Sequence, residues 1–188
     1  MPSTTSLHPD CERLLVSEDE IRATVDRLAR AIEDTYPDPD RRLVLVVILK
    51  GSMPFAADLM RQIRRPLELE FMKVSSYGAG TKSSGEIKVS LDLSRDDLDD
   101  IDLLVVEDII DSGYTLSRLS QLLRHRNAHS VRTCTLLDKP ARREVDFTPD
   151  FCGLCIPDEF VVGYGLDYNE QYRNLPYIGI LAPRIYTN

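Results

Sequence analysis

Residues 103–116 read LLVVEDIIDSGYTL, an apolar run that meets two acids and then a small, hydroxyl-rich turn. Apolar strands alternate with helical patterns through the middle of the chain, which predicts an α/β fold with a mostly parallel central sheet. Ligands of such sheets bind beyond the carboxyl ends of the strands, where Glu107 and Asp108 fall. Because neighbouring strand residues point to opposite faces, we expect these acids to hold two sides of a polyol, or one of them a hydrated cation.

The turn that follows resembles a cradle for a phosphate group. Ser112 and Thr115 add hydroxyl donors, Gly113 allows close backbone approach, and a helix expected near Leu116 offers unpaired amides that favour an anion. The spacing is not that of the P-loop. An acid beside a phosphate, Asp111, suggests proton transfer; the alternative is that Asp111 or Ser112 merely caps the helix.

Local patterns predict the neighbouring elements. Residues 17–20 have the form of a capping box, which predicts a helix that ends near Tyr36. Residues 43–49, LVLVVIL, are typical of a strand buried on both faces, and residues 53–63 of the helix that follows it. The short strands after residue 140 lack intervening helices and are expected to form a small accessory layer.

Residues 77–86, YGAGTKSSGE, predict a loop between two strands. The segment has three glycines, several hydroxyl groups and almost no apolar content, as mobile functional loops often do. The alternative is a plain hairpin loop without a role.

Composition limits the functional classes. The chain has 188 residues with a net charge of −8, which disfavours a nucleic-acid binder. Without an apolar run near the roughly 20 residues of a membrane helix, or the pattern of a secretory signal, we expect a cytoplasmic protein with no membrane partner. The simplest organisation is a single domain over residues 1–188, with residues 1–15 as a loose N-terminal arm.

Four cysteines are present: Cys11, Cys134, Cys152 and Cys155. The last two form a CxxC, but a zinc site would require a second pair. Strand alternation would also direct positions three apart to opposite faces. We therefore interpret the cysteines as buried or half-buried thiols in a reduced cytosol.

Four segments together resemble the type I phosphoribosyltransferases. VVEDIIDSGYTL (residues 105–116) is similar to their phosphoribosyl-pyrophosphate signature, in the form of the hypoxanthine-guanine branch. LKGS (49–52) is similar to their pyrophosphate loop, and SSYGAGTKSSGEIKV (75–89) to their lid. Residues 156–181 resemble their C-terminal purine and metal segment. The resemblance covers residues 43–181 and implies the fold of that family: a mostly parallel sheet flanked by helices, with a small hood and a flexible lid.

The resemblance implies roles for the signature. Glu107 and Asp108 would hold the ribose hydroxyls, in part through Mg²⁺, and Asp111 would exchange a proton with purine N7. The 5′-phosphate would be bound by Ser112, Gly113, Tyr114 and Thr115. Some members of the family carry lysine at the position of Tyr114, so the phosphate here would depend on backbone amides and hydroxyl groups.

The resemblance also implies roles for the pyrophosphate loop and the lid. Lys50, Gly51 and Arg173 would bind pyrophosphate, with a cis peptide bond between Leu49 and Lys50. Ser76 and Tyr77 would close over the reacting centre.

In the C-terminal half, Lys139 would bond the purine 6-oxo group, Phe160 would stack on the base, and Val161 would contact the purine edge through its backbone. Asp167 would hold a second Mg²⁺. Taken alone, Lys139 fits a solvated lysine and Phe160 a core residue. Asp167 and Arg173 alone fit a surface ion pair at helical spacing.

The function implied by the resemblance is purine salvage. A transferase would join hypoxanthine, and guanine, to 5-phosphoribosyl 1-pyrophosphate, giving IMP (GMP) and pyrophosphate, as a homodimer or homotetramer with Mg²⁺. One alternative is the same reaction with xanthine or guanine preferred. Another is a regulator without activity that senses phosphoribosyl pyrophosphate, which would show a basic face.

Overall fold

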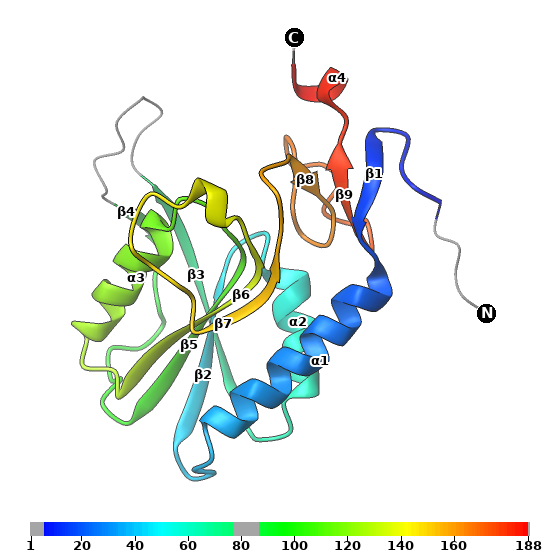
Figure 1. Cartoon of the computed structure of the whole chain (residues 1–188). Helices are drawn as coiled ribbons and strands as arrows, with labels where there is room; N and C mark the ends of the chain where they lie inside the picture. Colours follow the sequence, from blue (N-terminus) through cyan, green and yellow to red (C-terminus); the bar gives the residue numbers. More distant parts are fainter. Residues whose placement is uncertain (1–5, 77–86, 188) are drawn as a thin grey trace.

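A six-stranded sheet in the order β4-β3-β2-β5-β6-β7 forms the centre of the computed structural model, which describes residues 6–76 and 87–187 (Figure 1). Every neighbouring pair is parallel except β3 and β4. The strands are β2 (Arg42–Ile48), β3 (Glu68–Ser76), β4 (Ile87–Leu91), β5 (Ile101–Ile110), β6 (Ser130–Asp138) and β7 (Phe151–Cys155). The mostly parallel sheet predicted from the sequence is confirmed.

Helices cover both faces of this sheet (Figure 1). Helices α1 (Glu18–Thr35) and α2 (Met53–Gln62) pack on one face, and α3 (Tyr114–Arg124) packs on the other. Side chains of β2 alternate between the two cores, so both faces of the strand are buried. Two short helices, η1 (Pro140–Arg142) and α4 (Pro183–Tyr186), lie near the C-terminal half of the chain.

Helix α1 begins with the capping box that the sequence predicted. The Ser17 hydroxyl accepts a hydrogen bond from the Glu20 amide at 3.3 Å, and the Glu20 carboxylate accepts one from the Ser17 amide at 2.8 Å. This reciprocal pairing is the predicted capping box. The helix reaches its C-cap at Tyr36, as expected.

A second, three-stranded sheet in the order β1-β9-β8 forms the hood above one end of the main sheet (Figure 1). Strand β1 (Cys11–Val16) pairs antiparallel with β9 (Ile178–Leu181), and β9 pairs with β8 (Val161–Val162). The expectation of a loose arm over residues 1–15 is therefore wrong from Cys11 onward, because the partner of this strand lies at the far end of the chain. Residues 1–5 lie outside the described residues.

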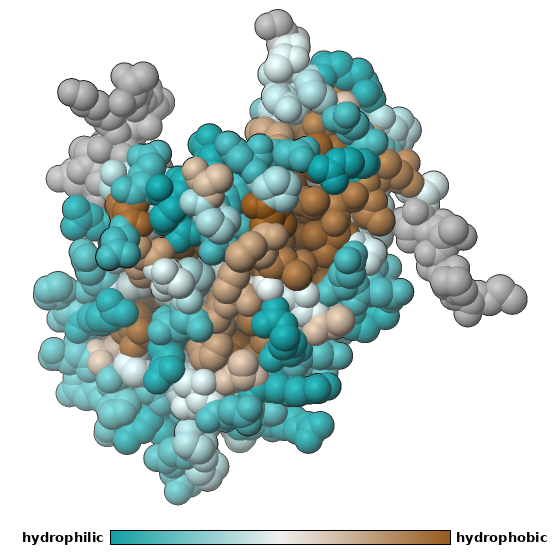
Figure 2. Space-filling view, in the orientation of Figure 1, coloured by the Kyte–Doolittle hydropathy of each residue, from teal (hydrophilic) through white to brown (hydrophobic). Residues whose placement is uncertain are grey.

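The expectation that the strands after residue 140 form a small accessory layer is correct only for β8 and β9. Strand β7 instead joins the main sheet beside β6. Apolar side chains of the small sheet, Val16, Val161, Ile178 and Ile180, share a core with α1. Figure 2 shows the apolar atoms that gather where this sheet meets the larger body.

The interpretation of the CxxC motif also needs correction. The thiols of Cys152 and Cys155 lie side by side, within hydrogen-bonding reach of each other. Cys155 is the last residue of β7, so the alternation of a regular strand no longer sets the direction of its side chain.

No helix in the described ranges is long and apolar enough to cross a membrane.

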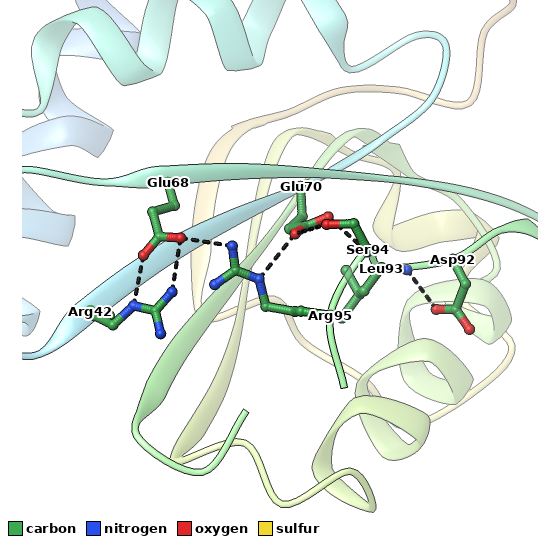
Figure 3. Close-up of polar contacts among 7 residues, drawn as sticks. All are labelled: Arg42, Glu68, Glu70, Asp92, Leu93, Ser94 and Arg95. Carbon is green, nitrogen blue, oxygen red and sulfur yellow. Dashed lines mark hydrogen bonds and ion pairs between the residues drawn. The ribbon is translucent and has the colours of Figure 1, made fainter. Parts of the chain in front are cut away.

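A charged network ties the loop after β4 to the start of β3 (Figure 3). Arg42 and Arg95 each donate to Glu68 at 2.7 Å. Arg95 also donates to Glu70 at 3.0 Å, and Ser94 donates to the same oxygen at 2.6 Å. Hydrogen bonds from Arg42 and Arg95 lower the pKa of Glu68 to about 2. Burial opposes ionisation of Glu70, but the bonds from Ser94 and Arg95 keep its pKa below the ordinary value.

We predict that Arg95→Met lowers the free energy of unfolding at pH 7 by about 1–3 kcal/mol, because Glu70 is buried and loses a charged partner. Carboxyl groups whose pKa is lowered by folding stabilise the fold above their unfolded pKa. That stabilisation is lost as the pH falls through the folded pKa, here from about 4.5 toward about 2. Denaturant unfolding between pH 7 and pH 3 should therefore show a steeper loss in the wild type than in Arg95→Met.

The control is Arg22→Met, which removes ion pairs to Glu18 and Asp19 from the exposed face of α1. Its effect should stay within about 0.5 kcal/mol at every pH. Parallel pH profiles for the wild type and Arg95→Met would contradict the role assigned to the network.

Candidate active site

A cleft of about 340 Å³ opens at the carboxyl ends of β2 and β5, beside the start of α3. Most of the signature segment contributes to it, together with the end of β2 and part of β3. Its lining residues are Ile48, Leu49, Val74, Ser75, Glu107, Ile109, Ile110, Asp111, Ser112, Gly113, Thr115 and Leu116. The sheet edge predicted from the sequence is thus the edge where the structure forms a cleft.

Glu107 and Asp108 form a hydrogen-bonded carboxyl pair. The expectation that they face opposite sides is wrong, because alternation fixes only the direction of each Cα–Cβ bond. Strand β5 also continues past both acids to Ile110. The Asp108 amide donates to the Ser52 hydroxyl at 3.1 Å, which anchors the pair to the start of α2.

Burial controls the charge of this pair. It raises the pKa of Glu107 well above its ordinary value, and the neighbouring Asp108 raises it further. Burial also raises the pKa of Asp108, although hydrogen bonds from Glu107 and the backbone oppose the rise. Among the described residues, buried Glu107 Oε2 has no hydrogen-bond partner. Such an oxygen fits a ribose hydroxyl or a Mg²⁺ ion, which prefers carboxylate ligands.

Two glycines allow the 49–52 loop to pack closely against the site. A Cβ at Gly51 would lie 1.7 Å from Asp108 Oδ2, and a Cβ at Gly165 would lie 1.9 Å from the Gly51 carbonyl oxygen. Gly165 also has a φ of 100°, which L side chains rarely adopt. The Leu49–Lys50 peptide bond is cis, as predicted.

Lys50 and Arg173 meet at a shared acid, Glu170. Lys50 Nζ lies 2.9 Å from Glu170 Oε2, and Arg173 Nη2 lies 3.4 Å from the same oxygen. Arg173 Nη2 also lies 2.8 Å from Asp167 Oδ1, and Nη1 donates to the Gly165 carbonyl at 2.7 Å. The two predicted pyrophosphate ligands thus lie together, beside the predicted metal ligand.

The Asp167–Arg173 ion pair exists, but it does not lie on a helix. Asn169, Glu170 and Tyr172 all have positive φ, so the chain makes tight turns between the paired residues. The role of Glu170 was missed. The available signal was an acid three residues before Arg173, which does not by itself reveal contact with Lys50.

Asp111 is held by an arginine that sequence reasoning did not single out. Arg142 Nε donates to Asp111 Oδ1 at 2.8 Å, and Arg143 Nε donates to the Asp111 carbonyl at 3.1 Å. The Asp111 side chain is 47% exposed, so this ion pair faces water. Both arginines follow Lys139 closely in sequence, which was the only available signal.

The turn at residues 112–115 keeps the start of α3 free of a side-chain cap. Gly113 is the N-cap residue, with a φ of 88° and no side-chain cap hydrogen bond. The alternative that Asp111 or Ser112 merely caps the helix is therefore excluded. The helix begins at Tyr114, two residues earlier than expected, so Tyr114 and Thr115 belong to its first turn. Amides in that position favour an anion.

Lys139 is not a solvated lysine. Its side chain is only 12% exposed, and Nζ donates to the Glu159 carbonyl at 2.7 Å. Phe160 is not a core residue, since it is 38% exposed. Its ring meets Tyr168 edge-on at 5.5 Å and stacks on Tyr186 at 5.0 Å between centroids. Val161 lies buried in β8 beside it.

Of the two predicted lid residues, only Ser76 lies within the described part of the chain. Ser76 is the last residue of β3, and Tyr77 lies outside the described residues. The antiparallel pairing of β3 with β4 places Ser76 opposite Ile87.

Comparison with known proteins identifies the family. The family model of the phosphoribosyl transferase domain matches residues 17–169. The chain belongs to this family. The fold is that of the type I phosphoribosyltransferases, because the structure superposes on a hypoxanthine phosphoribosyltransferase of Staphylococcus aureus with a TM-score of 0.92. That comparison has 44% identity and covers 98% of this chain and 100% of the other.

Two curated relatives differ in length. The hypoxanthine-guanine phosphoribosyltransferase of Bacillus subtilis is 50% identical over 94% of this chain and 97% of its own length. The bifunctional protein TilS/HprT of Listeria monocytogenes is 51% identical over 97% of this chain, but the match spans only 28% of that longer protein.

Proposed function

We propose that the chain is a purine-salvage transferase. It converts hypoxanthine, and guanine, with 5-phosphoribosyl 1-pyrophosphate to IMP (GMP) and pyrophosphate. The observation that carries this proposal is the half-buried Glu107–Asp108 pair, with Asp111 and the uncapped start of α3 a few residues beyond it. The similarity to hypoxanthine-guanine phosphoribosyltransferases along nearly the whole chain supports it.

The carboxyl pair suits the ribose. Glu107 and Asp108 would bind the ribose 2′ and 3′ hydroxyls, in part through Mg²⁺. The unpartnered Oε2 of Glu107 gains a hydrogen-bond donor or a cation when the sugar binds. The 5′-phosphate would rest on the amides and hydroxyls of Ser112, Gly113, Tyr114 and Thr115.

The leaving pyrophosphate requires positive charge at its own binding position, away from the 5′-phosphate turn. Lys50 and Arg173 supply it, with Gly51 allowing close backbone approach, and both cations are held now by Glu170. Glu170 is exposed, so an incoming pyrophosphate would replace it as the partner of both cations. Mg²⁺, held by Asp167 and by the ribose acids, would neutralise the negative charge that develops on the leaving group.

The purine would lie beside Phe160, with the Val161 backbone at its edge. Lys139 Nζ would donate to the 6-oxo group in exchange for its bond to the Glu159 carbonyl. Asp111 would exchange a proton with N7, and the ion pair with Arg142 holds its carboxylate in place until the base binds. Ser76 and Tyr77 would close over the centre and exclude water from the activated sugar.

The first test measures product formation with hypoxanthine, guanine, xanthine and adenine, each with phosphoribosyl pyrophosphate and Mg²⁺. We expect the highest kcat/KM for hypoxanthine. Adenine should be poorer by about 10⁴, because its 6-amino group cannot accept a hydrogen bond from Lys139. Preference for xanthine or guanine would correct the substrate. Binding of the sugar diphosphate without turnover of any base would favour the sensing regulator.

The second test addresses Asp111. We predict that Asp111→Asn reduces kcat by about 10²–10⁴ while the affinity for phosphoribosyl pyrophosphate is retained, since the amide keeps the shape but cannot take a proton. Rapid-quench kinetics and calorimetric titration separate the two effects. Glu144→Gln is the control, since it removes an exposed negative charge from the same region. Near-normal turnover in Asp111→Asn would refute the proton-transfer role.

We further propose that the chain forms a homodimer or homotetramer in the cytoplasm. An apolar groove between α2 and β3 suits a second copy, and Met53 and Phe71 in it are 55% and 41% exposed. Sedimentation velocity should show an oligomer for the wild type and a smaller species for Met53→Lys/Phe71→Lys. Leu14→Lys, on the exposed side of β1, serves as control. An unchanged sedimentation coefficient in the double variant would exclude this groove as the contact.

A further inference from the structure

Cys152, Cys155 and Asp138 form a compact group of metal-ligating side chains at the edge of the main sheet. One ligand atom from each residue lies within 4.8 Å of the others. Asp138 is the last residue of β6, and both cysteines belong to the edge strand β7. None of the three lines the cleft described above. The group therefore stands apart from the proposed sugar and metal ligands.

The backbone around this group is fixed by close packing. Cys155 pairs with Asp138 across the two parallel strands, and Cys152 pairs with Thr135. A Cβ at Gly153 would lie 2.2 Å from the Leu136 carbonyl oxygen, so only glycine permits this approach of the strands. Arg27 of α1 donates to the Gly153 carbonyl at 2.5 Å and to the Cys152 carbonyl at 3.4 Å. Strands β6 and β7 and helix α1 thus together fix the backbone that carries the ligand atoms.

A cation at this group would act on its protons. Burial raises the pKa of the Cys152 thiol to about 11, and the neighbouring Cys155 and Asp138 raise it too. The thiols are therefore protonated without metal, and a divalent ion must displace their protons, which it does by lowering the pKa of each thiol it binds. Arg143 contacts Asp138 through Oδ1 only, and a carboxylate has a second oxygen to offer.

The geometry and chemistry of the three ligands match zinc. Zinc–sulfur bonds of about 2.3 Å and zinc–oxygen bonds of about 2.0–2.2 Å place tetrahedral ligands about 3.5–3.8 Å apart. The three ligand atoms already lie within 4.8 Å of one another, so the side chains would close to that spacing as the ion binds. Two thiolates select zinc over Mg²⁺, which prefers oxygen ligands.

We propose that Cys152, Cys155 and Asp138 bind a thiophilic divalent cation of the zinc class, with water as the fourth ligand. Both thiols lose their protons to solvent as the ion binds, and no electron is transferred. The second pair of cysteines that a zinc site usually needs is replaced here by a carboxylate and water. The proposal does not depend on the transferase activity.

The test uses full-length protein kept reduced with a phosphine and freed of metal by a chelator. Co²⁺ serves as the spectroscopic probe, because thiolate ligands give charge-transfer absorption that oxygen ligands do not. Zn²⁺ affinity is then measured by competition with a chromophoric chelator. We expect charge-transfer absorption in the wild type that excess Mg²⁺ does not remove. Its absence would overturn the proposal.

Variants assign the absorption to these residues. Cys152→Ser/Cys155→Ser should abolish it, and Asp138→Asn should weaken Zn²⁺ binding by at least about tenfold. Cys11→Ser is the control, since it removes a thiol from the small sheet and should leave the absorption unchanged. Absorption that persists in the double variant would place the metal elsewhere and refute the assignment.

A measurement on the wild type avoids the risk that a variant fails to fold. Alkylation of each cysteine by iodoacetamide is followed by peptide mass spectrometry with Zn²⁺, with Mg²⁺ or without metal. Zn²⁺ should slow modification of Cys155, which is exposed, by at least tenfold, while Mg²⁺ leaves the rate unchanged. Equal rates under the three conditions would contradict the proposal.

Discussion

Two half-buried carboxyl groups on neighbouring residues, Glu107 and Asp108, are the constraint on which the site depends. Burial and the neighbouring Asp108 raise the pKa of Glu107, so a cation or a hydrogen-bond donor that approaches the pair would stabilise its charged form. The surroundings hold the pair in position: Ser52 holds the backbone of Asp108, and Gly51 leaves space for its carboxylate. Larger side chains there would displace the pair. The 49–52 loop, the start of α2 and the end of β5 therefore pack closely around the Asp108 carboxylate.

Three cations of the site contact exposed acids of the same chain. Lys50 and Arg173 contact Glu170, and Arg142 contacts Asp111. Exposed ion pairs of this kind contribute little stability and are readily exchanged for a ligand. They keep the positive side chains near their working positions and reduce local repulsion. The site is thus arranged for anionic substrates although the whole chain carries a charge of −8.

The sequence predicted the features that depend on neighbours along the chain. The capping box at Ser17, the buried strand β2 and the acids at the sheet edge follow from local pattern. Contacts between distant residues could not be predicted in this way. Glu170 lies 120 positions from Lys50, and Arg142 lies 31 positions from Asp111. The pairing of two thiols at the end of β7 escaped the alternation rule, because that rule applies only inside a regular strand.

The pairing of β1 with β9 has a consequence for folding while the protein is synthesised on the ribosome. Of the described strands, β1 is synthesised first, whereas its hydrogen-bonding partner β9 is synthesised last. The main sheet and its helices can assemble during translation, whereas the hood must wait for β9. Until then β1 has open backbone groups that invite wrong partners. Its two adjacent exposed charged side chains, Glu12 and Arg13, make such pairing less favourable while the chain is unfinished.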